Sequence, residues 1–154
     1  MNFTHEELLN FIHEASHNTY ASEDESLRKK QEDGSTTIEY TSDDWHYNDN
    51  YFGGEPYGGR EVVFYKGKAI WMMVYYGWVE KGASTKEVYP MLAEALRKSS
   101  PDLPYRGPKE YVNGDLKYVN TVDGTVENFI GEEFILKNEA IIFQTSYCGG
   151  LIDK

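Results

Sequence analysis

The sequence has little cysteine, little positive charge and no long apolar run. Cys148 is the only cysteine, so the chain forms no internal disulfide. There are 15 Lys and Arg residues against 26 Asp and Glu residues, and the net charge of −11 disfavours binding to nucleic acid or to an anionic membrane. The first residues lack the pattern of a signal peptide, and no apolar run has membrane length. These absences predict a cytoplasmic protein with no nucleic-acid or membrane partner.

The negative charge is concentrated in the first half of the chain. Residues 1–80 carry a net charge of −9, whereas residues 81–154 carry −2. A solvated acidic surface that keeps the protein soluble explains this excess. The alternative is that the first half uses its acidic groups to recognise a cationic partner.

The chain contains an internal similarity at an offset of 71 residues, clearest in the stretch 51–77. This stretch includes a predicted hairpin, with strands at 61–65 and 69–76 joined by a turn at Gly67. The identical pairs are Glu39 and Glu110, Tyr40 and Tyr111, Asp44 and Asp115, Tyr47 and Tyr118, Gly53 and Gly124, Glu61 and Glu132, Lys66 and Lys137, Ala69 and Ala140, Ile70 and Ile141, and Tyr76 and Tyr147. So many identities at one offset predict an internal duplication.

An amphipathic helix is predicted at the start of each repeat. Thr4 with a Glu three residues later has the capping-box pattern, and the apolar spacing continues to about Asn18. Ser84 repeats the capping pattern, and the same apolar face recurs at an offset of 80. Pro90 lies inside the second helix, which is therefore predicted to kink or to begin there.

Residues 21–35 are polar and are predicted to be a mobile linker. Runs of β-branched and aromatic residues predict eight strands, at 36–40, 45–51, 61–65, 69–76, 109–112, 116–122, 132–136 and 140–147. A helix followed by four antiparallel strands, twice, predicts a single α+β domain with pseudo-two-fold symmetry and repeats at about 3–79 and 83–152. The strands form either one continuous sheet or two curled sheets that each wrap a helix.

Four short motifs resemble an uncharacterised bacterial family that is known only as a domain of unknown function. The motifs are Tyr51-Phe52-Gly53-Gly54, Arg60-Glu61-Val62-Val63 with Lys66-Gly67, Tyr75-Tyr76-Gly77, and Pro104-Tyr105-Arg106-Gly107-Pro108. The resemblance covers nearly the whole chain. Some members of that family are fused to an XRE-type helix-turn-helix, which implies a regulatory or sensing role. The resemblance carries no catalytic residues over to this chain.

A His-Glu-x-x-His pattern occurs in the first predicted helix. In this pattern His13 and His17 would bind zinc on one helix face, and the intervening Glu14 would activate a water molecule. Both histidines lie opposite the predicted apolar stripe, and the second repeat has Ala93 and Arg97 at the equivalent positions. We therefore expect solvated helix residues and no metal site, with these two histidines as the weak alternative.

The predicted strand at 45–51 carries the more informative candidate site. Alternation places Trp45, Tyr47, Asp49 and Tyr51 on one face of this strand. The second repeat places Leu116, Tyr118, Asn120 and Val122 in the same way. A polar residue interrupts each apolar face, at Asp49 and at Asn120, and buried polar groups require partners. These residues either satisfy the fold internally or line a pocket.

A second aromatic face follows in the first repeat only. Trp71 and Tyr75 alternate along the strand at 69–76, whereas the second repeat has Ile142 and Ser146 there. Packing against the partner repeat is one explanation. The other is a ligand site for a cationic or ring-bearing molecule, formed with the acidic groups nearby.

The leading functional hypothesis is a non-enzymatic ligand-binding or regulatory module with an aromatic, acidic site in or near the first repeat. It rests on the duplication, the many aromatic residues and the lack of a convincing catalytic set. The alternative is an acidic inhibitor of the immunity or antitoxin type that binds a basic protein, and a zinc-dependent hydrolase is a more distant one. No cofactor and no catalytic residue is predicted.

Overall fold

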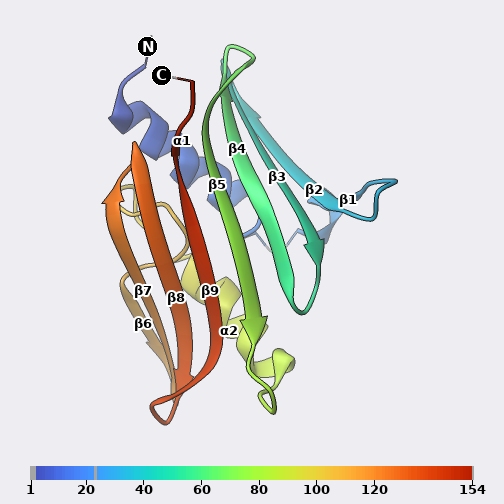
Figure 1. The fold of residues 1–154 in the computed structure, drawn as a ribbon, viewed down its shortest axis with the longest axis vertical. Coiled ribbons are helices and arrows are strands. Elements are labelled where there is room, and N and C mark those ends of the chain that lie inside the picture. Colours follow the sequence, from blue (N-terminus) through green and yellow to red (C-terminus); the bar gives the residue numbers. More distant parts are fainter. Residues whose placement is uncertain (1–2, 23, 154) are drawn as a thin grey trace.

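Nine strands form a single antiparallel sheet in the computed structural model, which describes residues 3–22 and 24–153. The strand order across the sheet is β1-β2-β3-β4-β5-β9-β8-β7-β6 (Figure 1). The elements are α1 (His5–Asn18), the 3-10 turn η1 (Glu25–Leu27), β1 (Lys29–Lys30), β2 (Thr36–Ser42), β3 (Trp45–Gly53), β4 (Tyr57–Tyr65), β5 (Lys68–Val79), α2 (Thr85–Leu96), β6 (Glu110–Asn113), β7 (Leu116–Thr125), β8 (Asn128–Lys137) and β9 (Ala140–Leu151). The α+β class is confirmed, and the strands form one continuous sheet rather than two.

The sheet has two halves that meet at the pairing of β5 with β9. All other neighbours in the sheet are strands that follow one another in the chain. At the junction, Tyr75 of β5 lies directly opposite Tyr147 of β9, so both side chains lie on the same face. The junction therefore places residues about seventy positions apart in the sequence side by side.

Both helices lie on this same face of the sheet (Figure 1). Leu8 of α1 belongs to a buried cluster with Trp71 in the first half-sheet, and Val88 of α2 belongs to a second cluster with Phe143 in the other half. The opposite face exposes apolar side chains such as Val74. Neither α1 nor α2, nor any other helix in the described residues, has the length and apolar composition that a membrane crossing requires.

The two predicted helix caps have different outcomes. Thr4 and Glu7 form the capping box, because the Thr4 hydroxyl accepts from the Glu7 amide at 3.1 Å and the Glu7 carboxylate accepts from the Thr4 amide at 2.6 Å. Ser84 precedes α2 but its side chain makes no capping bond, and the carboxylate three residues later, Glu87, pairs with Lys137 instead. α2 also continues through Pro90. The second capping box was thus a wrong prediction, since Lys137 competes for its carboxylate.

The segment between α1 and β2 was predicted to be a mobile linker, and its mobility remains a prediction. In the structure the described residues 24–35 contain η1 and β1, which pairs with the edge of β2. Asp33 caps the turn that follows, accepting from both the amide and the hydroxyl of Ser35 at 2.9 and 2.6 Å. Most side chains from 24 to 34 are exposed, whereas Ser35 is fully buried.

The connection between the strands predicted at 45–51 and 61–65 is shorter than predicted. β3 extends to Gly53 and β4 already begins at Tyr57, so only three residues join these strands. Position 59 lies inside β4 and requires glycine, because a Cβ there would meet the Tyr51 side chain and backbone. The extended pairing brings Tyr57 onto the helix-bearing face, where the candidate site lies.

Candidate functional site

A cavity of about 630 Å³ lies between the first half-sheet, α2 and the segments that follow the two helices. We call it the main cavity. Five tyrosines line it, namely Tyr20, Tyr51, Tyr57, Tyr75 and Tyr89. Its charged lining residues are Glu25, Arg28, Lys30, Asp49 and Arg106, and its aliphatic ones include Ile38, Leu92 and Leu96. Size and lining both match a small-molecule site, in which mostly apolar walls hold a few placed polar groups.

Asp49 is the buried carboxyl of the main cavity. It lies on β3, is only 3 % exposed, and its Oδ1 accepts a hydrogen bond from the Tyr75 hydroxyl at 2.6 Å. Burial raises the pKa of Asp49 to about 6, although the Tyr75 hydrogen bond and the charge of Arg106 oppose the increase. A carboxyl that titrates near neutrality therefore forms part of the cavity lining.

Glu61 lies beside Asp49, directly opposite it in the pairing of β3 with β4. It is 1 % exposed, and burial together with the charge of Asp49 raises the pKa of Glu61 to about 8. Neither Glu61 Oε1 nor the buried Tyr47 hydroxyl forms a hydrogen bond of normal geometry among the described residues, although the Tyr47 hydroxyl lies near enough to Glu61 to lower its pKa. Two adjacent carboxyls that are buried in this way cannot both ionise without cost, so the pair retains a proton at neutral pH.

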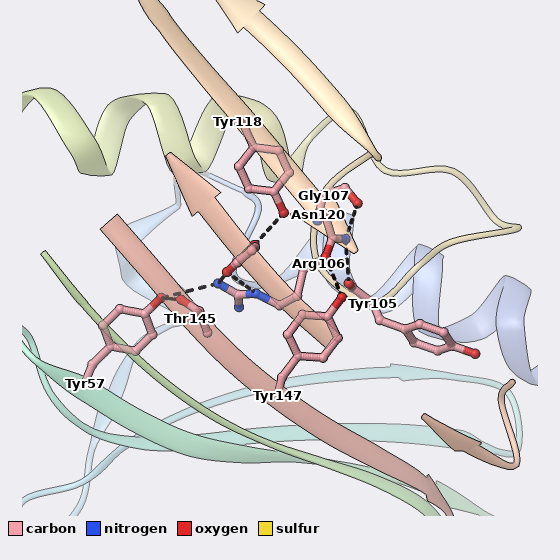
Figure 2. A network of polar contacts seen from close by, with 9 residues as sticks. Tyr57, Tyr105, Arg106, Gly107, Tyr118, Asn120, Thr145 and Tyr147 are labelled. Atoms are coloured by element: carbon pink, nitrogen blue, oxygen red, sulfur yellow. Dashed lines mark hydrogen bonds and ion pairs between the residues drawn. The ribbon is translucent and has the colours of Figure 1, made fainter. Parts of the chain in front are cut away.

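Arg106, the only buried arginine among the described residues, lies at the boundary between the two halves of the sheet. Its Nε and Nη2 donate to Oε1 of Glu133 at 2.8 and 2.6 Å, and Nη2 reaches the Tyr57 hydroxyl at 3.4 Å (Figure 2). The guanidinium also lies 5.7 Å from the ring centroid of Tyr20 and 5.6 Å from that of Tyr75. Arg106 has φ +86°, a strained value for a residue other than glycine, and such strain is often found at functional sites.

A fully hydrogen-bonded polar cluster surrounds Glu133 in the second half-sheet (Figure 2). The Tyr118 hydroxyl donates to Glu133 and accepts from the Gly107 amide at 3.0 Å. Asn120 accepts from the Tyr147 hydroxyl at 2.6 Å and donates to the Gly107 carbonyl at 2.9 Å. The 104–108 connector is therefore fixed onto β7 and β8, and this holds Arg106 in place.

The outer part of the main cavity is formed by the β3–β4 connection and by the segment at 25–30. The Tyr89 hydroxyl of α2 donates to the Gly54 carbonyl at 2.8 Å and to the Glu55 carboxylate. On the other side Arg28 pairs with Glu25. Short contacts between elements that are distant in the sequence thus border the open side of the cavity.

Comparison with known proteins identifies the family but no function. A family model described as a domain of unknown function, DUF5680, matches residues 49–152, which is more than half of the chain. The chain belongs to the DUF5680 family. No match was found among curated proteins or among solved structures.

The predicted site residues of this DUF5680 protein fall into three groups. Asp49, Tyr51 and Tyr75 line the main cavity together. Three others are packed in the core: Trp45 against Phe11 and Tyr65, Tyr47 with no exposed surface, and Trp71 in a stack with Tyr105 and Phe129. Tyr118 and Asn120 belong to the Glu133 cluster, and Asn120 also borders a smaller cavity of about 360 Å³.

The two candidate zinc ligands face the end of α2 and not open solvent. His13 Nε2 lies 3.2 Å from the Ser99 carbonyl, and His17 Nε2 lies 3.2 Å from the Arg97 carbonyl. Their rings are 4.3 Å apart. Within the described part of the chain, no group of three or more His, Cys, Asp and Glu side chains gathers at one point. The expectation that both histidines are simply solvated was wrong, because they link the two helices.

Several DUF5680 cavity residues were missed from the sequence. Arg106 belongs to the Pro104–Pro108 motif, and an arginine beside glycine and between prolines is a signal that points to a special position. Tyr20 and Arg28 lie in or next to the predicted linker, and Tyr89 lies at the margin of the apolar face of α2, packed against its core cluster. Their joint position depends on how three segments fold over the sheet, which local patterns do not reveal.

Proposed function

We propose that this DUF5680 protein is a non-enzymatic binding module for a ring-bearing small molecule, which occupies the main cavity. The observation that carries the proposal is a buried carboxyl and a buried tyrosine hydroxyl, Asp49 and Tyr75, in the lining of a mostly apolar cavity. Apolar walls supply affinity through burial, and the few polar groups orient the ligand.

The tyrosines of the cavity favour a planar ligand. Tyr51, Tyr57 and Tyr89 are half-buried, so their rings offer area that a ligand would cover, and tyrosine rings favour stacked and edge-to-face contacts. The volume of about 630 Å³ lies in the usual range for drug-sized molecules. The alternative partner, a basic protein, would bury a broad surface and would not need a cavity of this kind.

We also propose that the two halves arose by duplication and that the module is regulatory. Asp49 of β3 and Asn120 of β7 match at the offset of 71. Glu61 of β4 matches Glu133 of β8, at an offset of 72, rather than Glu132, so the second repeat would carry one additional residue between β7 and β8. A sensing role in a bacterial protein accords with the resemblance to proteins that join this domain to an XRE-type helix-turn-helix. In such a protein the ligand state of the cavity would be the signal.

A thermal-shift screen with ring-bearing compounds tests the binding function. Gly54 lies in the cavity lining, and a Cβ at this position meets no atom within 4 Å. Gly54→Trp should therefore fill the mouth of the cavity without disturbing the fold, and Gly54→Ala is the matched control. We expect a compound that stabilises the wild type and Gly54→Ala but not Gly54→Trp, because only the bulky side chain excludes it. A screen in which no compound stabilises the wild type, or in which Gly54→Trp responds equally, would contradict the proposal.

A further inference from the structure

Three buried carboxyls and one buried arginine lie around the main cavity. Glu133, Asp49 and Glu61 are each at most 3 % exposed, and Arg106 is the single buried cation among the described residues. The guanidinium pairs with Glu133 through both Nε and Nη2. Its charge acts on Asp49 and Glu61 only at longer range. Arg28 and Arg60 likewise lower the pKa of Asp49 from longer range, but among the described residues neither Asp49 nor Glu61 forms a direct ion pair with a cation.

In the second half-sheet, the position that corresponds to Asp49 holds an uncharged amide. Asn120 takes the place on β7 that Asp49 has on β3, and each accepts a hydrogen bond at 2.6 Å from a tyrosine of the central strands. An amide would thus satisfy the Tyr75 hydroxyl equally well. The structural task of position 49 does not require a carboxylate, so its negative charge calls for another explanation.

We propose that the ligand carries a cationic group that binds Asp49 and displaces the proton held by the Asp49–Glu61 pair. This inference rests on the proposed binding function of the main cavity and names the chemistry of the ligand, an amidinium, guanidinium or ammonium group attached to a ring. The proton leaves the carboxyl pair for solvent, and an ion pair replaces it, so no co-reactant is required. The net charge of the buried groups is therefore the same before and after binding.

Ring faces in this region already hold a cation. The Arg106 guanidinium lies 5.7 and 5.6 Å from the ring centroids of Tyr20 and Tyr75. Tyr51 and Tyr57 offer further ring area on the cavity side. Aromatic faces attract cations through their quadrupole, and the attraction is stronger where water is excluded. A ligand cation would therefore meet both a carboxylate and ring faces.

The charged and titratable groups around the pair determine how strongly binding depends on pH. They are Arg28 beside β1, Tyr47 on β3, Arg60 on β4, Tyr75 on β5, Tyr20 after α1, Arg106 from the 104–108 connector and Glu133 on β8. The arginines lower the pKa of Asp49, while Glu133 raises the pKa of Glu61. An added cation acts in the same direction as the arginines, so it lowers both pKa values and releases protons.

Titration calorimetry of the full chain with benzamidine and benzamide tests the inference, because these probes share a shape and differ in charge. We expect benzamidine to bind at least about tenfold more tightly than benzamide at pH 7.5. The observed heat should vary with the ionisation enthalpy of the buffer and indicate release of up to about one proton. The affinity for benzamidine should rise between about pH 5.5 and pH 8.5, since the carboxyl pair loses its proton in that window.

Two variants locate the effect. Asp49→Asn should reduce the preference for benzamidine to about the level of benzamide, whereas Asp123→Asn, which removes the same charge from an exposed site on β7, should leave it unchanged. Carbon-13 NMR titration of the Glu61 carboxyl without any probe should show protonation persisting to neutral pH. If benzamidine binds no better than benzamide, or Asp123→Asn has the same effect as Asp49→Asn, the cation assignment is overturned.

The outcomes separate this inference from the proposed function. Equal binding of both probes, blocked by Gly54→Trp, would retain the cavity as a site and reject the cation. Preferred binding of benzamidine with no buffer-dependent heat would reject the displacement of the proton. Failure of both probes and of all ring-bearing compounds would overturn the inference and the proposed function together.

Discussion

The polar clusters of the two half-sheets occupy matching positions but differ in completeness. In the second half, Glu133 has Arg106 and Tyr118 as partners, and Asn120 both donates and accepts. In the first half, Asp49 has Tyr75, but one oxygen of Glu61 forms no hydrogen bond of normal geometry within the described residues. A buried polar network is favourable only when its members are satisfied. The complete cluster serves the fold, and we assign the incomplete one, beside the main cavity, to ligand binding.

The clearest way to break the complete cluster is Arg106→Met. The substitution leaves Glu133 buried without its cation, and loss of one partner of a buried ion pair costs about 3–5 kcal/mol. Urea unfolding at pH 7 measures the loss in free energy of unfolding. Lys117→Met, which removes an exposed partner of Glu110, should cost less than about 1 kcal/mol. Similar losses in free energy of unfolding for both variants would show that the buried pair of Arg106 and Glu133 contributes no more than an exposed ion pair.

The next test exchanges the residue types at the matching positions 49 and 120 of the two clusters. Asn120→Asp should cost about 1–3 kcal/mol, because a carboxylate cannot donate to the Gly107 carbonyl and places a charge in a buried site. Asp49→Asn should change the free energy of unfolding by less than about 1 kcal/mol, since an amide oxygen still accepts from Tyr75. Both values come from denaturation curves at pH 7. A large loss in Asp49→Asn, with probe binding unchanged, would make Asp49 a structural acceptor and reject its role in the cavity.

Glu61→Gln should change how the free energy of unfolding depends on pH. The raised pKa of Glu61 means that the native state keeps a proton which the unfolded chain loses above its ordinary pKa of 4.5, so the wild-type free energy of unfolding falls as the pH rises from about 5 to 8. Glutamine resembles the protonated acid and cannot ionise. The variant should match the wild type near pH 5 and exceed its stability by about 1–3 kcal/mol near pH 9. Glu132→Gln, an exposed neighbour, should show no such divergence.

The smallest expected effect is on protease cleavage of residues 24–34, the segment beside the first cluster. Residues 24–34 are mostly exposed and attach through a two-residue strand, so we expect the first cleavage by a nonspecific protease to fall there. Because Arg28 and Lys30 line the main cavity, a bound ligand should slow this cleavage. Mass spectrometry of the fragments gives the position. First cleavage in the 97–109 segment instead would show that the segment before β2 is docked.

The patterns that could be predicted from the sequence are local ones. Alternation along 45–51 placed Tyr47 and Asp49 on a common buried face, and the Thr4 capping box defined the start of α1. The cavity escaped prediction because Arg106 enters it from a connector with a left-handed backbone conformation. For Trp71 the sequence left two explanations open, packing against the partner repeat and a ligand site, and its stacking on Tyr105 and Phe129 of the second repeat confirms the packing. The sequence could not decide between them, because nothing in those two segments signals this contact.

The pairing of β5 with β9 has a consequence for how the protein forms. The hairpins within each half close short loops, whereas Trp71 and Leu151 must meet across about half of the chain. Contacts of such long sequence separation form slowly, because the entropy of a large loop is lost before any contact compensates for it. Asp49 lies on one side of this late junction and Arg106 is anchored on the other. Because Arg106 is held by Glu133 of β8, its side chain can take its place in the main cavity only after that half of the sheet has formed.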